Sequence, residues 1–120
     1  LTKDSTFEIN VSQNTSIDQV DFDNIAFGKV FSDHLFVMDY VDGEWKRGSI
    51  EPFAPLSLSP STMALHYGQA VFEGMKAYAQ PDGGISLFRP EANAKRFAKS
   101  AARIALPEMP VDFFVETVEL

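Results

Sequence analysis

The dipeptide Asp42-Gly43 constrains the fold of this 120-residue chain more than any other feature. It separates two runs of strand-forming residues, "HLFVMDYV" and "EWKRGSI", and an Asp-Gly pair in that position is typical of a tight β-hairpin turn. Residues 81–84, Pro-Asp-Gly-Gly, provide the same turn chemistry between "KAYAQ" and "ISLFR". The two hairpins together predict an antiparallel sheet.

The segment that begins at Pro90, "PEANAKRFAKSAARIAL", has the strongest helical pattern in the chain. Proline is tolerated at the first helical position. At about 100° per residue, the apolar side chains fall on one side of this helix and the lysines and arginines on the other. We expect Phe97 and Ile104 to face the sheet, and Pro107 and Pro110 to end the helix. The predicted fold class is therefore α+β, with helices packed on an antiparallel sheet.

Shorter helices are predicted on either side of the second hairpin. Ser61 or Thr62 can cap a helix that runs towards Phe72, although Gly68 weakens it. Asp112 can cap a helix near the carboxyl-terminal end. That last helix is cut off after about two turns, and isolated helices of this length are marginal. We therefore expect the chain to be the amino-terminal portion of a longer protein.

Composition and charge exclude several classes of function. Residues 1–24 are polar and predict an extended or partly ordered arm, which leaves 25–120 as the folded domain. The formal charge of -7 argues against nucleic-acid binding, which needs a basic surface. The chain has no cysteine, no apolar run of the roughly 18 residues that a membrane span requires, and no signal-peptide pattern at its start. A cytoplasmic protein without nucleic-acid or membrane partners is expected.

The residues that most often carry chemistry have ordinary interpretations in the sequence. His34 and His66 are far apart and lack a ligand-like pattern, so structural roles are favoured and no metal site is expected. The amine of Lys76 can form a Schiff base only if its environment lowers the pKa, and its place at the start of a predicted strand favours a solvated lysine. Tyr67 and Phe72 suit either the wall of a ligand pocket or a core cluster, and the pattern alone favours the core.

Three blocks, "FGKVFSDHLFVMDY", "PFAPLSLSPSTMALHYGQAVFEGMKAY" and "ISLFRPEANAKRFAKSAARIALP", resemble the amino-terminal domain of branched-chain amino acid aminotransferases. The resemblance runs from about Ile25 to the last residue. It implies a pyridoxal-phosphate enzyme of fold type IV, a homodimer as the full-length protein, that passes the amino group of leucine, isoleucine or valine to 2-oxoglutarate. It also implies that the Schiff-base lysine lies in a carboxyl-terminal domain absent from this chain, that Lys76 is not the catalytic amine, and that the isolated chain is inactive.

The same resemblance assigns individual site residues. Arg96, in "NAKRF", matches the position that binds the cofactor phosphate, although helical periodicity alone places it on a solvated side. Phe27, Tyr67 and Phe72 match positions that line the pocket for the substrate side chain. Arg89, in "LFRP", is a weaker candidate, for which a structural or sheet-edge role is expected.

Two other kinds of function stay open at this point. One is another fold-type-IV enzyme, either a D-amino acid aminotransferase or an aminodeoxychorismate lyase, although the block "LHYGQAVFEG" favours the branched-chain group. The other is a non-catalytic module that contributes pocket walls and dimer surface without binding the cofactor by itself. For the isolated chain, the second interpretation is favoured.

Overall fold

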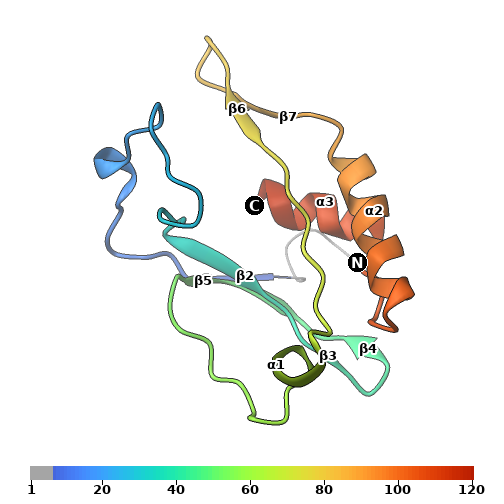
Figure 1. Cartoon of the computed structure of the whole chain (residues 1–120). Coiled ribbons are helices and arrows are strands. Elements are labelled where there is room, and N and C mark those ends of the chain that lie inside the picture. Colours follow the sequence, from blue (N-terminus) through green and yellow to red (C-terminus); the bar gives the residue numbers. More distant parts are fainter. Residues whose placement is uncertain (1–6) are drawn as a thin grey trace. The chain divides into compact units, whose positions relative to one another are not determined.

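The computed structural model describes residues 7–120, and the chain divides into two compact units (Figure 1). Unit 1 spans Leu1–Ser57 and unit 2 spans Leu58–Leu120. Each unit combines short strands with helical segments, as the predicted α+β class requires. Among the described residues, no helix has both the length and the apolar character needed to cross a membrane.

Unit 1 is built around the hairpin predicted at Asp42-Gly43. Its described elements are β1 (Phe7–Ile9), the 3-10 helix η1 (Ile17–Gln19), β2 (His34–Val37), β3 (Tyr40–Val41), β4 (Glu44–Trp45) and β5 (Gly48–Pro52). β2 pairs with β5 and β3 pairs with β4, both antiparallel, which confirms the hairpin. Asp42 and Gly43 have φ angles of 54° and 82°. Positive φ at both positions is the requirement of a type I′ turn, whose twist matches that of the strands.

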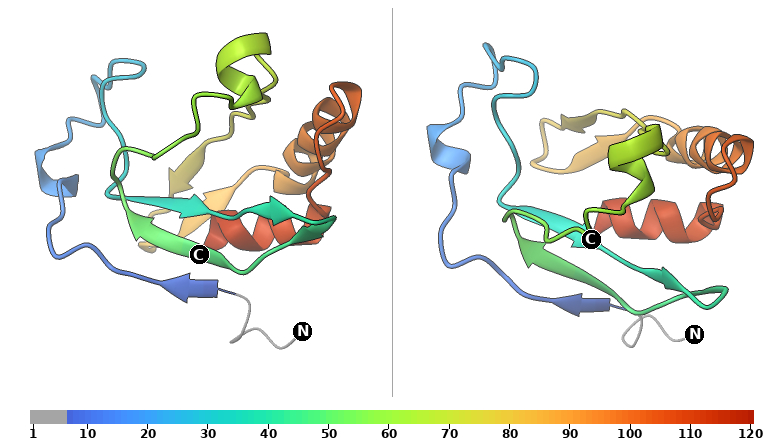
Figure 2. Two further views of the ribbon diagram at one scale, coloured as in Figure 1. Left: turned by 90° about the horizontal axis from the view of Figure 1, so that it is seen from below. Right: turned by 60° about the horizontal axis from the view of Figure 1, so that its bottom comes forward.

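A third strand comes from the predicted amino-terminal arm. β1 lies parallel to β5, with Phe7 opposite Gly48, so that β5 is the central strand of this sheet (Figure 2). The buried ring of Phe7 meets the ring of Phe36 edge to face, with centroids 5.7 Å apart. Gly48 lies against both rings and has no side chain of its own to displace them. Residues 1–6 of the predicted arm lie outside the described residues.

Unit 2 contains the second predicted hairpin. Its described elements are α1 (Met63–Tyr67), β6 (Ala77–Ala79), β7 (Ile85–Leu87), α2 (Pro90–Arg103) and α3 (Val111–Glu119). β6 and β7 pair antiparallel, with Ala77 opposite Leu87, which confirms the hairpin. The expectation that both hairpins build one sheet is wrong, because within the described residues β6 and β7 pair only with each other. Each strand is three residues long, so this hairpin offers little edge for further pairing.

The long helix α2 packs on another helix. It begins at Pro90, as predicted. Ala94 and Ala101 are each 1% exposed, and the ring of Phe97 lies 5.3 Å from that of Phe114 on α3. The partner that the structure gives Phe97 is therefore an aromatic ring of α3, where the sequence predicted a sheet. Small side chains at positions 94 and 101 let the two helices approach closely.

The ends of the two shorter helices were predicted with mixed success. α1 follows Thr62, as expected, and ends at Tyr67, because the next residue, Gly68, has a left-handed φ of 63° that stops the helix sooner than predicted. α3 begins after Pro110, so the prediction that Asp112 caps it is wrong. Asp112 lies in the first turn, where its negative charge favours the positive end of the helix dipole.

Candidate functional site

Unit 2 holds a polar cluster of three side chains, Glu73, Asn93 and Arg96, which we call the Glu73 cluster. Asn93 and Arg96 lie three residues apart on α2 and therefore on the same face of that helix. Glu73 comes from the irregular segment between α1 and β6. The cluster thus ties this segment to the helix that follows the second hairpin.

The carboxylate of Glu73 is the centre of the cluster. Arg96 approaches it as a fork, with Nε donating to Oε2 at 2.8 Å and Nη2 donating to Oε1. Nδ2 of Asn93 donates to Oε1 at 3.0 Å and to the carbonyl oxygen of Gly74 at 2.9 Å. The backbone N–H of Gly74 also donates to Oε1, at 3.0 Å. One carboxylate therefore accepts hydrogen bonds from three residues.

Burial and charge differ between the two ends of the ion pair. The side chain of Glu73 is 8% exposed, whereas that of Arg96 is 62% exposed. The hydrogen bond from Arg96 lowers the pKa of Glu73 below its ordinary value of 4.5; burial opposes this shift, and the hydrogen bonds from Asn93 and Gly74 add to it. The same hydrogen bond raises the pKa of Arg96. Both groups are therefore charged at neutral pH.

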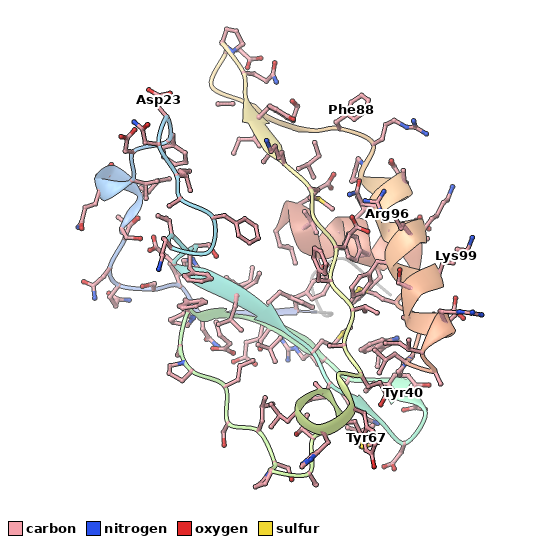
Figure 3. All side chains as sticks on the ribbon, in the orientation of Figure 1. Asp23, Tyr40, Tyr67, Phe88, Arg96 and Lys99 are labelled. Atoms are coloured by element: carbon pink, nitrogen blue, oxygen red, sulfur yellow. The ribbon has the colours of Figure 1, made fainter. Side chains whose placement is uncertain are left out.

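Arg96 keeps capacity for a further anion. A guanidinium has five N–H donors, and the fork to Glu73 engages one on Nε and one on Nη2. Arg96 borders a hollow of about 570 Å³ whose lining residues are Arg96, Lys99, Ser100, Ala102 and Arg103. Figure 3 shows Arg96 and Lys99 projecting from α2. Three cationic side chains beside one hollow, in a chain of charge -7, have the donor chemistry that a phosphate group requires.

The predicted cofactor contact thus fits the residues present, and the assignment of Arg96 to a phosphate stays a prediction. Arg89, the weaker candidate, directly precedes α2 and has left-handed backbone angles, φ 52° and ψ 53°. Its position directly before the helix fits a structural role, which stays a prediction. Lys76 is exposed, next to the first residue of β6.

The three aromatic residues predicted to line a substrate pocket are strongly exposed. The exposed fractions are 102% for Phe27, 80% for Tyr67 and 89% for Phe72. Tyr67 ends α1 and Phe72 directly precedes Glu73, so both belong to unit 2, whereas Phe27 belongs to unit 1. The interpretation of Tyr67 and Phe72 as a core cluster is wrong, because neither ring is buried.

Both histidines make hydrogen bonds to the backbone. Nε2 of His34 accepts the backbone N–H of Ser12 at 2.8 Å, and Nε2 of His66 donates to the carbonyl oxygen of Pro60 at 2.5 Å. These contacts fit the structural roles that the sequence favours, which stay a prediction. In the part of the chain that the structure describes, no three His, Cys, Asp or Glu side chains gather in a way that suits a metal ion.

Unit 1 has a hollow of a different kind. Its volume is about 330 Å³, and its lining residues are Ser16, Ile17, Val20, Phe22, Ile25, Val30, Phe31, Ser32, Asp33 and His34. The carboxylate of Asp33 accepts hydrogen bonds from the hydroxyl groups of Thr15 and Ser16 and from the backbone N–H of Ser16. The carboxylate of Asp33 is therefore already hydrogen-bonded to neighbouring residues, and the rest of the lining is mainly apolar.

Sequence reasoning missed Glu73 and Asn93. The spacing of Asn93 and Arg96 on one predicted helix was a signal that they share a face. The carboxylate that joins them lies 20 residues before Asn93 and 23 before Arg96, and no local pattern connects it to the helix.

Comparison with known proteins identifies the class to which the chain is related. No protein-family model matches the chain. A Streptomyces coelicolor protein named "Probable branched-chain-amino-acid aminotransferase" is 48% identical over 97 residues, which cover 80% of this chain and 27% of that protein. A Mycolicibacterium smegmatis "Branched-chain-amino-acid aminotransferase" is 44% identical over 116 residues, 93% of this chain and 32% of that protein. The class is therefore that of the amino acid aminotransferases.

The family within this class is specified by the names that these relatives share. A third relative, "Branched-chain-amino-acid transaminase 1" of Bacillus subtilis, is 46% identical over 96 residues, 79% of this chain and 27% of that protein. Over the segment that it shares with them, the chain is similar to the branched-chain-amino-acid aminotransferases. It spans between 27% and 32% of the length of these relatives. Their names do not favour a D-amino acid aminotransferase or an aminodeoxychorismate lyase.

Proposed function

We propose that this chain forms part of a pyridoxal-phosphate-dependent enzyme that transfers the amino group of leucine, isoleucine or valine to 2-oxoglutarate. The observation that carries the proposal is the 48% identity to the Streptomyces coelicolor protein over 80% of this chain. The proposal includes a fold-type-IV architecture, a homodimer and a cytoplasmic location for the full-length enzyme.

In this proposal, Arg96 holds the phosphate of the cofactor. The fork to Glu73 fixes one edge of its guanidinium, and the N–H groups that remain are the donors offered to phosphate oxygens. Lys99 and Arg103, beside the same hollow, add positive charge that favours a dianion. When bound, the cofactor supplies the electron sink for the chemistry, and the protein supplies binding and orientation.

The exposed aromatic residues supply apolar walls. We assign Phe27, Tyr67 and Phe72 to the pocket for the branched side chain of the substrate, where they exclude water. Burial of each methylene contributes about 0.8 kcal/mol. Substrates that differ by one methylene are separated by only about 1 to 3 kcal/mol in such a pocket. Use of all three branched-chain amino acids follows.

This chain contributes binding groups without the reactive amine. We propose that the Schiff-base lysine belongs to a part of the full-length enzyme that does not align with this chain, and that Lys76 remains a solvated amine. The 120-residue chain by itself is therefore inactive as a transaminase. Reduction with borohydride in the presence of pyridoxal phosphate, followed by mass mapping, should leave Lys76 without selective labelling. Saturating labelling of Lys76 contradicts this division of roles.

The decisive test is the donor specificity of the full-length enzyme that carries this chain. With 2-oxoglutarate as acceptor, L-leucine, L-isoleucine and L-valine should each act as donors, and D-alanine should not. A preference for D-alanine identifies a different fold-type-IV enzyme. Absence of transamination with every donor, in a folded enzyme saturated with pyridoxal phosphate, rejects the proposed reaction.

A further inference from the structure

We infer that Glu73 is a positioning residue for Arg96, which orients the guanidinium so that its free N–H edge faces the anionic group of the ligand. This inference rests on the proposed function, because it takes the cofactor phosphate as that group. It gives a role to the buried carboxylate of Glu73, which the assignment of Arg96 to the phosphate does not explain.

The fork between the two side chains determines which edge of Arg96 is free. Glu73 engages Nε with Oε2 and Nη2 with Oε1, so the guanidinium is held along one side. Nη1 and the second hydrogen of Nη2 point away from the carboxylate, because the group is planar and its donors have fixed directions. A long, exposed arginine loses rotamer freedom when it binds an anion, and a prior contact reduces that loss.

Glu73 is itself held in place by its neighbours. Its side chain is 8% exposed, and Asn93 and the N–H of Gly74 donate to the same oxygen, Oε1. Asn93 also bonds the carbonyl oxygen of Gly74, so the backbone next to Glu73 is tied to α2. The carboxylate is thus a fixed support, while the arginine that it holds reaches solvent with 62% of its side chain exposed.

A negative charge beside an anion site has an electrostatic cost that has to be weighed against positioning. Asn93 and Gly74 share the charge of Glu73 through their hydrogen bonds, which reduces its effect on a second anion. Lys99 and Arg103 form no ion pair within the described residues, so their charges are available at the hollow. The two roles of Glu73 predict opposite results when its charge is removed. Simple neutralisation of Arg96 predicts tighter anion binding in Glu73→Gln, and positioning predicts weaker binding.

The test measures the dissociation constant of pyridoxal phosphate for the full-length apoenzyme by titration of the cofactor absorbance. Arg96→Ala should weaken binding by about tenfold or more, the ratio expected for charge-assisted hydrogen bonds. Glu73→Gln should also weaken it, by about tenfold, as expected for a coupled neighbour. In the Arg96→Ala background, Glu73→Gln should have no further effect. Pyridoxal, which lacks the phosphate, should bind all these variants equally.

A matched control removes a carboxylate from α2, the helix that carries Arg96, without touching the cluster. Glu91→Gln changes the charge by the same amount in the first turn of α2 and should leave the dissociation constant unchanged. If Glu73→Gln does not fold, as judged by circular dichroism, Asn93→Ala replaces it. That variant removes one support of the carboxylate and should weaken pyridoxal phosphate, but not pyridoxal, by about threefold. An unchanged affinity in that variant overturns the inference.

The remaining outcomes separate the inference from the proposed function. No effect of Arg96→Ala on pyridoxal phosphate binding rejects Arg96 as the phosphate contact, and with it the basis of this inference. If Arg96→Ala weakens pyridoxal phosphate binding while Glu73→Gln leaves it unchanged or strengthens it, Arg96 remains the phosphate contact and the positioning role of Glu73 is rejected. A third result is that Glu73→Gln lowers the affinity for pyridoxal phosphate equally in the wild type and in Arg96→Ala, or lowers the affinity for pyridoxal as well. Either form of this result shows that Glu73 acts through the general structure of unit 2, and rejects the positioning role.

Discussion

The ring of Phe97 on α2 lies 5.3 Å from the ring of Phe114 on α3, with the two planes tilted by 43°. Ala94 and Ala101, on the same helix as Phe97, are each 1% exposed. Because these alanines are the buried hydrophobic residues of unit 2 among those described, the contact between α2 and α3 is the core of that unit. The same helix carries Arg96, so the stability of this contact bears directly on the candidate site.

Phe97→Ala should lower the free energy of unfolding of unit 2 by about 2 kcal/mol, because Phe97 is half-buried and a fully buried phenylalanine contributes more. Urea unfolding followed by circular dichroism measures the change. Phe88→Ala is the matched control, since that ring is 76% exposed and its removal should have little effect. Equal effects of the two substitutions contradict a core formed by α2 and α3.

Ala101→Leu should destabilise the same contact by overpacking. A leucine at this position adds volume where α2 meets α3, at a cost of about 1 to 3 kcal/mol. Ala102 is the next residue and is exposed, so Ala102→Leu should be nearly neutral. The midpoints of thermal unfolding of the two variants distinguish them, and a neutral Ala101→Leu shows that the helices do not pack at this residue.

The end of α2 predicts a substitution that stabilises the protein. Ala105 has a φ of 56°, and the N–H groups of Ala105 and Leu106 bond the carbonyl oxygens of Ala102 and Ala101. This is the Schellman arrangement, in which glycine is usual at the left-handed position. Ala105→Gly should therefore raise the free energy of unfolding by about 0.5 to 1 kcal/mol. Ala102→Gly, within the helix, should lower it by about 1 kcal/mol. If Ala105→Gly lowers the free energy of unfolding as Ala102→Gly does, the backbone at Ala105 is not strained.

Local chemistry made the elements predictable, and distant contacts made their partners unpredictable. Asp42-Gly43 and the proline at position 90 restrict the backbone of their immediate neighbours, so the hairpin and the start of α2 followed from the sequence. The local sequence around Phe97 does not specify that its packing partner is the ring of Phe114 instead of a strand. The cap of α3 was misplaced by two residues, to Asp112 from Pro110, because several nearby residues suit a helix start.

The candidate site shows the same limit. Arg96 was singled out by resemblance, since helical periodicity placed it on a solvated side, and its 62% exposure agrees with that periodicity. Glu73 was not predicted, because its hydrogen bonds to Arg96 and Asn93 join an irregular segment to a helix beyond the intervening hairpin. The local pattern around Tyr67 and Phe72 favoured a core position for both rings. Both residues are exposed in the structure, because exposure depends on which distant segments pack against them.

The ion pair of Glu73 predicts how stability depends on pH. Its pKa in the folded chain is lowered, chiefly by the hydrogen bond from Arg96, from an ordinary value of 4.5. The contribution of a carboxylate with a lowered pKa is present well above the unfolded value and is lost as the pH falls below 4.5 through the folded value. The difference in free energy of unfolding between the wild type and Glu73→Gln should therefore shrink on acidification. A difference that stays constant from about pH 7 to about pH 3 contradicts the assignment.

Gly48 predicts the sharpest steric effect in unit 1. A Cβ added there would lie 2.7 Å from Cε2 of Phe36, closer still to Cζ, and 3.4 Å from Cδ1 of Phe7. The ring of Phe36 packs against the buried ring of Phe7, so it cannot yield without disturbing that contact. Gly48→Ala should lower the free energy of unfolding of unit 1 by about 1 to 3 kcal/mol.

The control and the rescue for this substitution use the same geometry. Gly74→Ala places a Cβ in open space and should be tolerated by comparison. Phe36→Leu removes the ring atoms that meet the new methyl group, so the double variant Gly48→Ala, Phe36→Leu should lose less stability than the sum of the two single changes. Denaturant unfolding of the four proteins gives this coupling energy. Additive losses show that the methyl group meets no obstacle at Phe36, and a fully stable Gly48→Ala variant shows that β5 accepts a side chain between the two rings.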